Sequence, residues 1–150
     1  LKLLDRQIKK RNLIANLYLN RLKDYYLKYD ILKKPNFKFP TYLSKKNSKK
    51  SNLNLHAFYR LNLFINKDKI NQNKLIQKLN ENKINCGVGS CPEIYREKVF
   101  KKLKVYPKKR LVNAKLLGDT SFMIPINPYR SLTKIKTEIN SIKKILNKYL

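Results

Sequence analysis

Residues 1–22 read LKLLDRQIKKRNLIANLYLNRL, and this stretch decides how the rest of the chain is arranged. Its apolar residues recur at the spacing of one face of an amphipathic helix. We predict a single helix from Leu1 to about Tyr29. No starting Met, capping residue or turn precedes it, so we expect the chain to be part of something larger. The apolar stripe of this helix is predicted to contain Leu4, Ile8, Ala15, Leu19, Leu22 and Tyr26.

The remaining sequence predicts a small sheet with helices packed on it. Residues 55–65 alternate with a period of two, as a strand does, and residues 84–88 and 121–124 predict two further strands. Helices are predicted over 72–82, 93–103, 109–117 and 133–149. Asp68 or Asn71 is expected to cap the first of these helices, and Gly118 to end the third at its C′ position. One face of the first strand is predicted to carry Leu55, Ala57, Tyr59, Leu61, Leu63 and Ile65.

This order of elements indicates an α+β (α/β) fold: a long N-terminal helix leads into a three- to four-stranded sheet with helices packed on it. We divide the chain into a helix at 1–30, a basic loop at 31–54 and a small domain at 55–150. The polar stretch 44–52 favours a solvated loop over a phosphate-binding one. No segment is long and apolar enough to predict a membrane span, and no signal peptide is visible.

The charge of the chain first suggests nucleic-acid binding, because Lys and Arg total 36 against nine acidic residues, a net charge of +27. Two features weaken this interpretation. Lys outnumbers Arg by 29 to 7, whereas bidentate recognition favours Arg. The excess is also spread along the chain and accompanies 18 Asn residues, as AT-rich codons would produce. A basic nucleic-acid-binding module therefore remains an alternative of low weight.

Few residues in the sequence suggest catalysis. One His and two Cys, Cys86 and Cys91, predict neither a triad nor a zinc site, and two free thiols are favoured over a disulfide. The segment 87–95 follows a strand, is flanked by glycines and carries several hydrogen-bonding groups. We select Ser90, Cys91, Glu93 and Tyr95 there, with an ordinary turn as the alternative. Tyr59 and Arg60 are further candidates, although Tyr59 is also consistent with a core aromatic residue.

Several segments resemble one family in order and spacing. The opening helix is similar to the family pattern at Leu1, Leu4, Asp5, Arg11, Ile14, Ala15, Tyr18 and Leu22. Residues 89–100, GSCPEIYREKVF, resemble the run GSCxEIYxEKAF of one branch, and residues 114–123, AKLLGDTSFM, resemble its AxxLGxTSLMF. Together they resemble the C-terminal part of the DegT/StrS sugar aminotransferases, which are fold type I enzymes. Departures from the pattern occur at Pro92, Asn127, Tyr129 and Arg130.

The resemblance implies transfer of an amino group, usually from glutamate, to a keto-sugar carried on a nucleotide, by a cytoplasmic homodimer that uses pyridoxal 5′-phosphate. In the family the Lys that forms the Schiff base lies upstream, in a large domain. We therefore expect no catalytic, cofactor-binding or metal-binding residue in this chain and no activity from it alone. Helix 1–30 would lie between the two domains, and the six candidate residues would contact substrate. A non-catalytic small domain that partners a separate catalytic chain is a further alternative.

Overall fold

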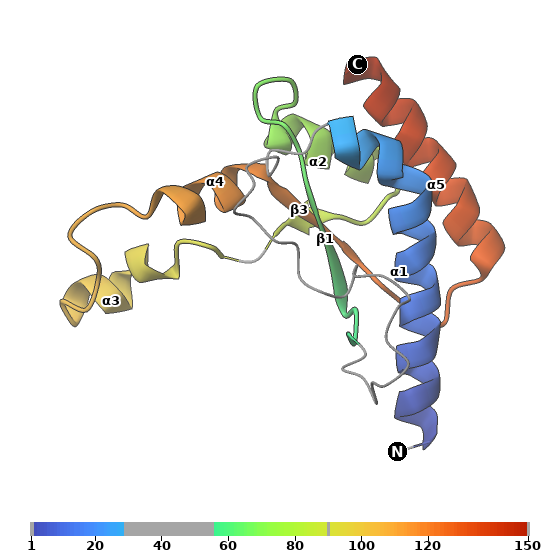
Figure 1. Ribbon diagram of the computed structural model, residues 1–150, viewed down its shortest axis with the longest axis horizontal. Coiled ribbons are helices and arrows are strands. Elements are labelled where there is room, and N and C mark those ends of the chain that lie inside the picture. Colours follow the sequence, from blue (N-terminus) through green and yellow to red (C-terminus); the bar gives the residue numbers. More distant parts are fainter. Residues whose placement is uncertain (1, 29–55, 90, 150) are drawn as a thin grey trace.

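The computed structural model describes residues 2–28, 56–89 and 91–149, without the side chains of residues 2, 23–28 and 149. The predicted basic loop at 31–54, Ser90, Leu55 and the Tyr26 side chain lie outside this description. In chain order (Figure 1), the elements are α1 (Lys2–Lys28), β1 (Arg60–Phe64), α2 (Gln72–Glu81), β2 (Gly87–Val88), η2 (Ile94–Arg96), α3 (Lys98–Lys102), α4 (Val112–Thr120), β3 (Ser121–Pro125), α5 (Leu132–Leu146) and η3 (Asn147–Tyr149).

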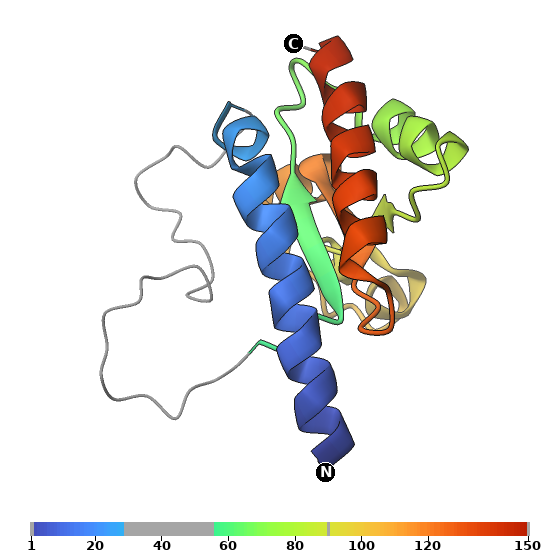
Figure 2. The ribbon, with the colours of Figure 1, turned by 90° about the vertical axis from the view of Figure 1, so that its right-hand side faces the viewer.

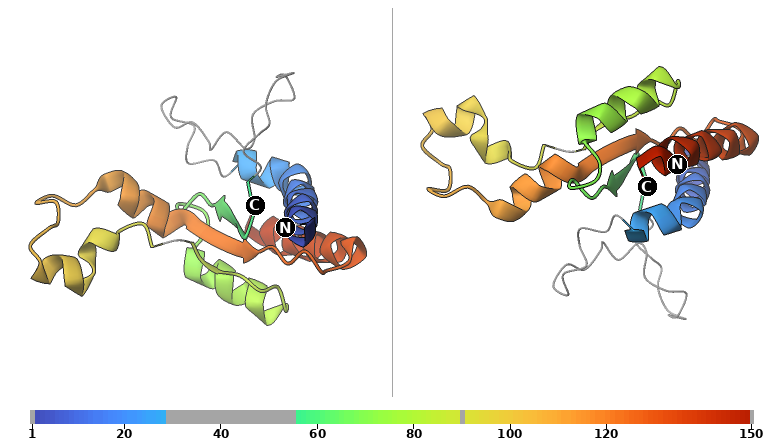
Figure 3. Two further views of the ribbon diagram at one scale, coloured as in Figure 1. Left: turned by 90° about the horizontal axis from the view of Figure 1, so that it is seen from below. Right: turned by 90° about the horizontal axis from the view of Figure 1, so that it is seen from above.

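The sheet has three strands in the order β1-β3-β2, with both pairs antiparallel. The helices α1, α2 and α5 cover one of its faces, and Figure 2 looks onto that face with α1 and α5 in front of β1. Figure 3 shows α4 continuing from β3 in nearly the same direction, away from α1 and α5. The predicted α+β fold is thus confirmed, with three strands where three or four were expected.

The first strand is shorter than predicted because Phe58 interrupts the alternation. Phe58 has a φ of 42° and its side chain is buried, so the extended backbone begins only after it. Its N–H donates to Nδ1 of His56 across 3.0 Å, which closes a local turn. Leu61 and Leu63 then face the core as expected. Tyr59, predicted to share their face, is 67% exposed, so that part of the prediction is wrong.

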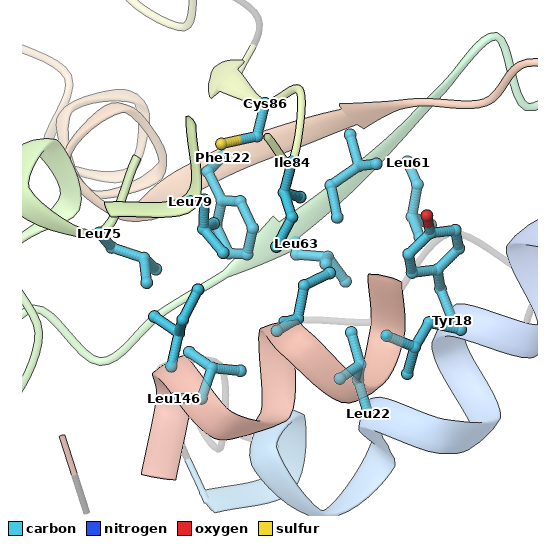
Figure 4. Close-up of a cluster of buried hydrophobic side chains, with 14 of the residues drawn as sticks. Tyr18, Leu22, Leu61, Leu63, Leu75, Leu79, Ile84, Cys86, Phe122 and Leu146 are labelled. Atoms are coloured by element: carbon cyan, nitrogen blue, oxygen red, sulfur yellow. The ribbon is translucent and has the colours of Figure 1, made fainter. Parts of the chain in front are cut away.

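The core lies between the sheet and the three helices, as Figure 4 shows. Leu61 and Leu63 of β1 stand opposite Ile124 and Phe122 of β3, so these side chains share the covered face. The helices contribute apolar stripes, and each apolar side chain moved from water to this core stabilises the fold by about 1.5–3 kcal/mol. The buried apolar residues of these helices are Ile14, Ala15, Tyr18, Leu22, Leu75, Leu79, Ile135, Ile139, Ile142, Ile145 and Leu146.

The buried face of α1 differs from the predicted stripe. Leu4 is 49% exposed, and Ile8 and Leu19 are half-buried, whereas the fully buried positions lie at residues 14, 15, 18 and 22. The reason is length: the first turns of α1 extend past the end of the sheet (Figure 2) and have no layer beneath them. The repeat of apolar residues in the sequence predicted the helix correctly, but it did not predict which part of the helix packs on the sheet.

Most of the other helix predictions agree with the structure. Asn71, rather than Asp68, caps α2 by accepting from the N–H of Lys74, and Ser131 caps α5 in the same way. The irregular helix expected over 93–103 consists of η2 and α3. The strand expected over 84–88 is reduced to β2, although Ile84 and Cys86 before it are buried.

The prediction that Gly118 ends a helix at its C′ position is wrong. Gly118 lies inside α4, and its φ is not positive. A Cβ at this position would lie 2.7 Å from Cγ of Pro92. Gly118 is therefore needed for the close approach of Pro92 rather than for a left-handed cap. Through this contact the sequence before η2 packs on the side of α4.

Gly118→Ala is expected to destabilise the chain by about 1–3 kcal/mol, because the added methyl overpacks against the rigid Pro92 ring. Urea unfolding followed by far-ultraviolet circular dichroism measures this. Gly87→Ala is the matched control: its Cβ would meet only Cε of Met123, at 3.4 Å, and little change is expected. A gain in stability for Gly118→Ala, as helix propensity alone gives, would contradict the packing role.

Candidate functional site

The loop between β2 and α4 holds three of the predicted site residues, Cys91, Glu93 and Tyr95; the fourth, Ser90, lies outside the described residues. The backbone enters this loop closely packed on β3. The N–H of Gly89 donates to the carbonyl of Ser121 across 3.3 Å, and a Cβ on Gly89 would lie 2.8 Å from Cβ of Ser121. Gly89 is therefore needed for the close packing of this backbone on Ser121 of β3, rather than for contact with a ligand.

Glu93 is held by a network that we call the Glu93 latch, formed by Glu93, Tyr95 and Arg110. Nε and Nη2 of Arg110 donate to the two carboxylate oxygens at 2.7 and 2.6 Å. The Tyr95 hydroxyl donates to Oε1 of Glu93 across 2.8 Å and accepts from the N–H of Leu111 across 3.0 Å. Since Arg110 and Leu111 lie just before α4, the latch joins the beginning and the end of the loop.

The latch fixes the charge of Glu93. The hydrogen bonds from Arg110, assisted by the Tyr95 hydroxyl, lower the pKa of the Glu93 carboxyl to about 2, against an opposing effect of burial. The carboxylate is therefore ionised near neutral pH, and both of its oxygens are engaged. This geometry suits a residue that shapes the loop better than one that exchanges protons with a substrate.

The two cysteines are free thiols, as predicted, with different surroundings. Cys91 is exposed, and its sulfur lies 3.8 Å from Oε1 of Glu97. Cys86 is buried and donates to the carbonyl of Ile76 across 3.7 Å, and burial raises the pKa of its thiol to about 11. Cys86 is thus an inert core residue, and only Cys91 is accessible.

Tyr59 and Arg60 form an exposed pair at the start of β1. The guanidinium carbon of Arg60 lies 5.6 Å from the centre of the Tyr59 ring, within cation–π range. The carbonyl of Tyr59 accepts from the N–H of Ile126 across 3.2 Å, which fixes the backbone of the pair against the end of β3. An exposed guanidinium beside an aromatic face is able to bind an anion and stack a ring.

The structure does not bring all the predicted site residues together. Arg60 stands opposite Pro125, while the loop with Glu93 departs beside Ser121, at the other end of β3. That strand is about 13 Å long at a rise of roughly 3.3 Å per residue. Two separate candidate surfaces therefore exist.

Sequence analysis missed a groove beside the first turns of α1, at the end of the sheet where Pro125 lies. Its volume is about 560 Å³, and Gln7 donates there to the Tyr129 hydroxyl. Exposed Leu residues and basic side chains give the groove a mixed apolar and cationic character. The one feature of the sequence that pointed to this groove was Tyr129, where the chain departs from the family pattern. The groove is lined by Leu3, Arg6, Gln7, Lys9, Lys10, Leu13, Pro128 and Tyr129.

A cluster of the buried Tyr18 and Glu138 with the half-buried Arg130 holds the turn that carries Tyr129. The Tyr18 hydroxyl donates to Oε1 of Glu138, and Nη2 of Arg130 donates to Oε2. Burial, and then the hydrogen bond to Glu138, raise the pKa of Tyr18 above its usual value, so the hydroxyl remains a donor. Sequence analysis assigned no role to Glu138, because a single acidic residue in a helix is usually exposed.

The described residues contain no grouping suited to a metal ion and no Lys suited to a Schiff base. No group of three His, Cys, Asp or Glu in them could hold a metal ion. A Lys that forms a Schiff base is usually desolvated, yet every Lys whose burial the structure describes is exposed or half-buried. These residues therefore do not fit a pyridoxal phosphate site. None of the described helices is long and apolar enough for a membrane span.

The positive charge is distributed over several elements. Exposed basic side chains occur on α1, α2, α3 and α5, including Arg21, Lys74, Lys101 and Lys136. These helices belong to different parts of the fold, both in the layer over the sheet and beyond its edge (Figure 3). This distribution gives no support to the nucleic-acid alternative, which requires one contiguous basic face.

The latch predicts a titration that can be measured at one residue. Carbon-13 NMR of the side-chain carboxyl carbons, in a chain with four Glu residues, should give Glu93 a midpoint near the pKa of about 2 set by Arg110. Because this pKa is lower than the value of about 4.3 in an unfolded chain, the latch is fully stabilising above pH ~4.3. Its contribution is lost as the pH falls through the lower pKa.

Arg110→Ala should raise the Glu93 midpoint toward about 4.3. Arg96→Ala serves as the control, since Arg96 reaches Glu93 only at 3.5 Å, against 2.6 Å for Arg110. A Glu93 midpoint that stays low after Arg110→Ala would contradict the latch.

The fold of this chain is similar to that of two solved aminotransferases. The chain superimposes on an aminotransferase from Psychrobacter cryohalolentis with a TM-score of 0.76 and 22% identity, over 99% of this chain and 36% of that one. The chain also superimposes on Helicobacter pylori PseC, an aminotransferase involved in the biosynthesis of pseudoaminic acid. The TM-score is 0.65 and the sequence identity 14%, over 94% of this chain and 33% of PseC. The chain thus spans about a third of these solved relatives.

No curated protein sequence matches the chain. The sequence profile of the DegT/DnrJ/EryC1/StrS aminotransferase family, however, matches residues 1–143, which include α1, the whole sheet and most of α5. The chain therefore belongs to the DegT/DnrJ/EryC1/StrS aminotransferase family.

Proposed function

We propose that this chain is the small C-terminal domain of an aminotransferase that uses pyridoxal 5′-phosphate to aminate a keto-sugar carried on a nucleotide. The family match supports the reaction class, and PseC, one of the similar structures, is involved in the biosynthesis of pseudoaminic acid. The proposal includes glutamate as the amino donor, a homodimeric full-length protein and a cytoplasmic location. It also takes helix 1–30 as the connection between a large domain and the small domain at 55–150.

The observation that carries the proposal is the exposed first half of α1. The family match begins at residue 1, so these turns belong to the family's own sequence. Leu3, Leu4 and Leu13 are nevertheless 64%, 49% and 46% exposed. Apolar residues in a family helix that this domain leaves uncovered are expected where a second domain packs.

The proposal places the cofactor in the part of the enzyme outside this chain, because the described residues do not fit it. The role left to this chain is to bind and orient substrate. Arg60 is exposed and forms no ion pair among those found in the described residues, so its guanidinium is available to a diphosphate. Tyr59 beside it offers a ring face on which a base stacks.

In this proposal, Glu93 and Tyr95 act on substrate through the loop whose shape they fix, as positioning residues. Cys91 is the accessible side chain at the start of that loop, and Ser90 stays a proposed contact next to it. The proposal thus assigns direct contact with the anionic part of the substrate to Arg60 and orientation of the loop to the Glu93 latch.

The test uses the complete gene product that contains this chain. It should show the visible absorbance of bound pyridoxal phosphate and aminate a nucleotide-linked keto-sugar. Arg60→Ala should raise KM for that substrate about tenfold, equal to about 1.4 kcal/mol, the range of a hydrogen bond to a charged group. The turnover number should change little, because Arg60 binds the substrate away from the reacting carbon.

Arg21→Ala is the matched control, since Arg21 is exposed on α1 and has no assigned contact with substrate. A complete gene product without bound cofactor and without amination would overturn the proposed function. An unchanged KM in Arg60→Ala, in an active enzyme, would remove Arg60 from the substrate site.

A further inference from the structure

Residues 91–112, which we call the arm, leave the end of the sheet on the side away from α1 and α5 (Figures 1 and 3). The arm contains η2, α3 and the first residue of α4. None of its residues is buried in this structure. It therefore has no hydrophobic core of its own and takes no part in the core of the domain.

The arm exposes apolar side chains at a density that no other part of the described chain reaches. Val112 is 77% exposed, Leu103 63% and Val105 61%, with Val99 and Tyr106 also at least half exposed. Exposed apolar groups concentrated in one segment are expected where a protein contacts another surface. Helices as short as η2 and α3 are also unstable in water without tertiary packing, so the arm needs a covering surface.

Local interactions give the arm a defined shape before anything covers it. The Glu93 latch closes its base. Helix α3 ends in a Schellman motif, because the N–H of Val105 donates to the carbonyl of Phe100 and that of Lys104 to Lys101. Lys104 takes the left-handed conformation that this motif requires, with a φ of 57°. The motif turns the backbone so that Leu103 and Val105 remain outside.

The charge of the arm restricts what covers it. The arm holds eight basic and two acidic residues, a formal net charge of +6. Its complement is therefore an apolar surface with an acidic rim. A second copy of this strongly cationic chain is a poor complement. Single-stranded nucleic acid is also a poor complement, because it binds aromatic stacking platforms, whereas most of the exposed apolar side chains here are aliphatic.

We propose that the arm is a docking element that packs on the part of the gene product outside these 150 residues, on an apolar surface with an acidic rim. This inference rests on the proposed function, in which that part is the cofactor-bearing domain. The chain matches only 36% and 33% of the two solved relatives. The remaining two thirds of such proteins are large enough to supply the surface on which the arm would pack.

The experiment places a photoreactive benzoylphenylalanine at position 103 in the complete gene product, inside cells, and identifies the cross-linked peptides by mass spectrometry. Position 136 on α5, also exposed, carries the same group in a matched control. We expect cross-links from position 103 to peptides outside residues 1–150, in severalfold higher yield than from position 136. Both positions are at the surface, so neither variant threatens folding.

Cross-links only within residues 1–150, cross-links to nucleic acid, or none at all would overturn the docking proposal. A gene product that consists of these 150 residues alone would also overturn it. The visible absorbance of bound pyridoxal phosphate is recorded on the same preparation. Cofactor without the expected cross-link refutes the docking proposal alone, and the cross-link without cofactor refutes the proposed function alone.

Discussion

The carboxylate of Glu138 lies at the junction of α1, α5 and the turn after β3, and the arrangement of these three parts depends on it. A buried carboxylate is tolerated only when its oxygens have partners. Tyr18 donates to one of these oxygens and Arg130 to the other. Loss of either partner leaves a buried charge partly unsatisfied, which costs far more than the pair contributes as a contact. The cluster therefore specifies one position of α1 along α5.

This position divides α1 into two parts with different roles. The turns around Ile14 and Tyr18 are fully buried and belong to the core of the small domain. The earlier turns form an apolar and cationic groove with Tyr129, which Arg130 of the cluster holds in place. The arm presents a second surface of the same mixed character from the other end of β3. A domain with two such surfaces is suited to pack against further protein on two sides, and it matches about a third of the solved relatives.

Periodicity in the sequence was sufficient to find the elements, because a helix or strand with one covered face must repeat its apolar residues. It could not find Phe58, whose positive φ shifts the exposed face of the strand, or the contact between Gly118 and Pro92, since both depend on packing partners distant in sequence. For the site, the residue types directed attention to Glu93 and Tyr95, but their use in the latch required Arg110, which lies 17 residues beyond Glu93. The groove of α1 was missed because the sequence pattern does not say where a covering layer ends.

The central claim is that α1 is clamped to the small domain at its middle and left uncovered at its start. Native-state amide hydrogen exchange on the 150-residue chain, resolved by residue, tests it most directly. The account predicts that the amides of Ala15 and Tyr18 are protected as strongly as those of Ile139 and Ile142 in α5, while amides in the first two turns of α1 exchange quickly. Uniformly fast exchange along the whole of α1 would contradict the clamp, and uniform strong protection would contradict the uncovered start.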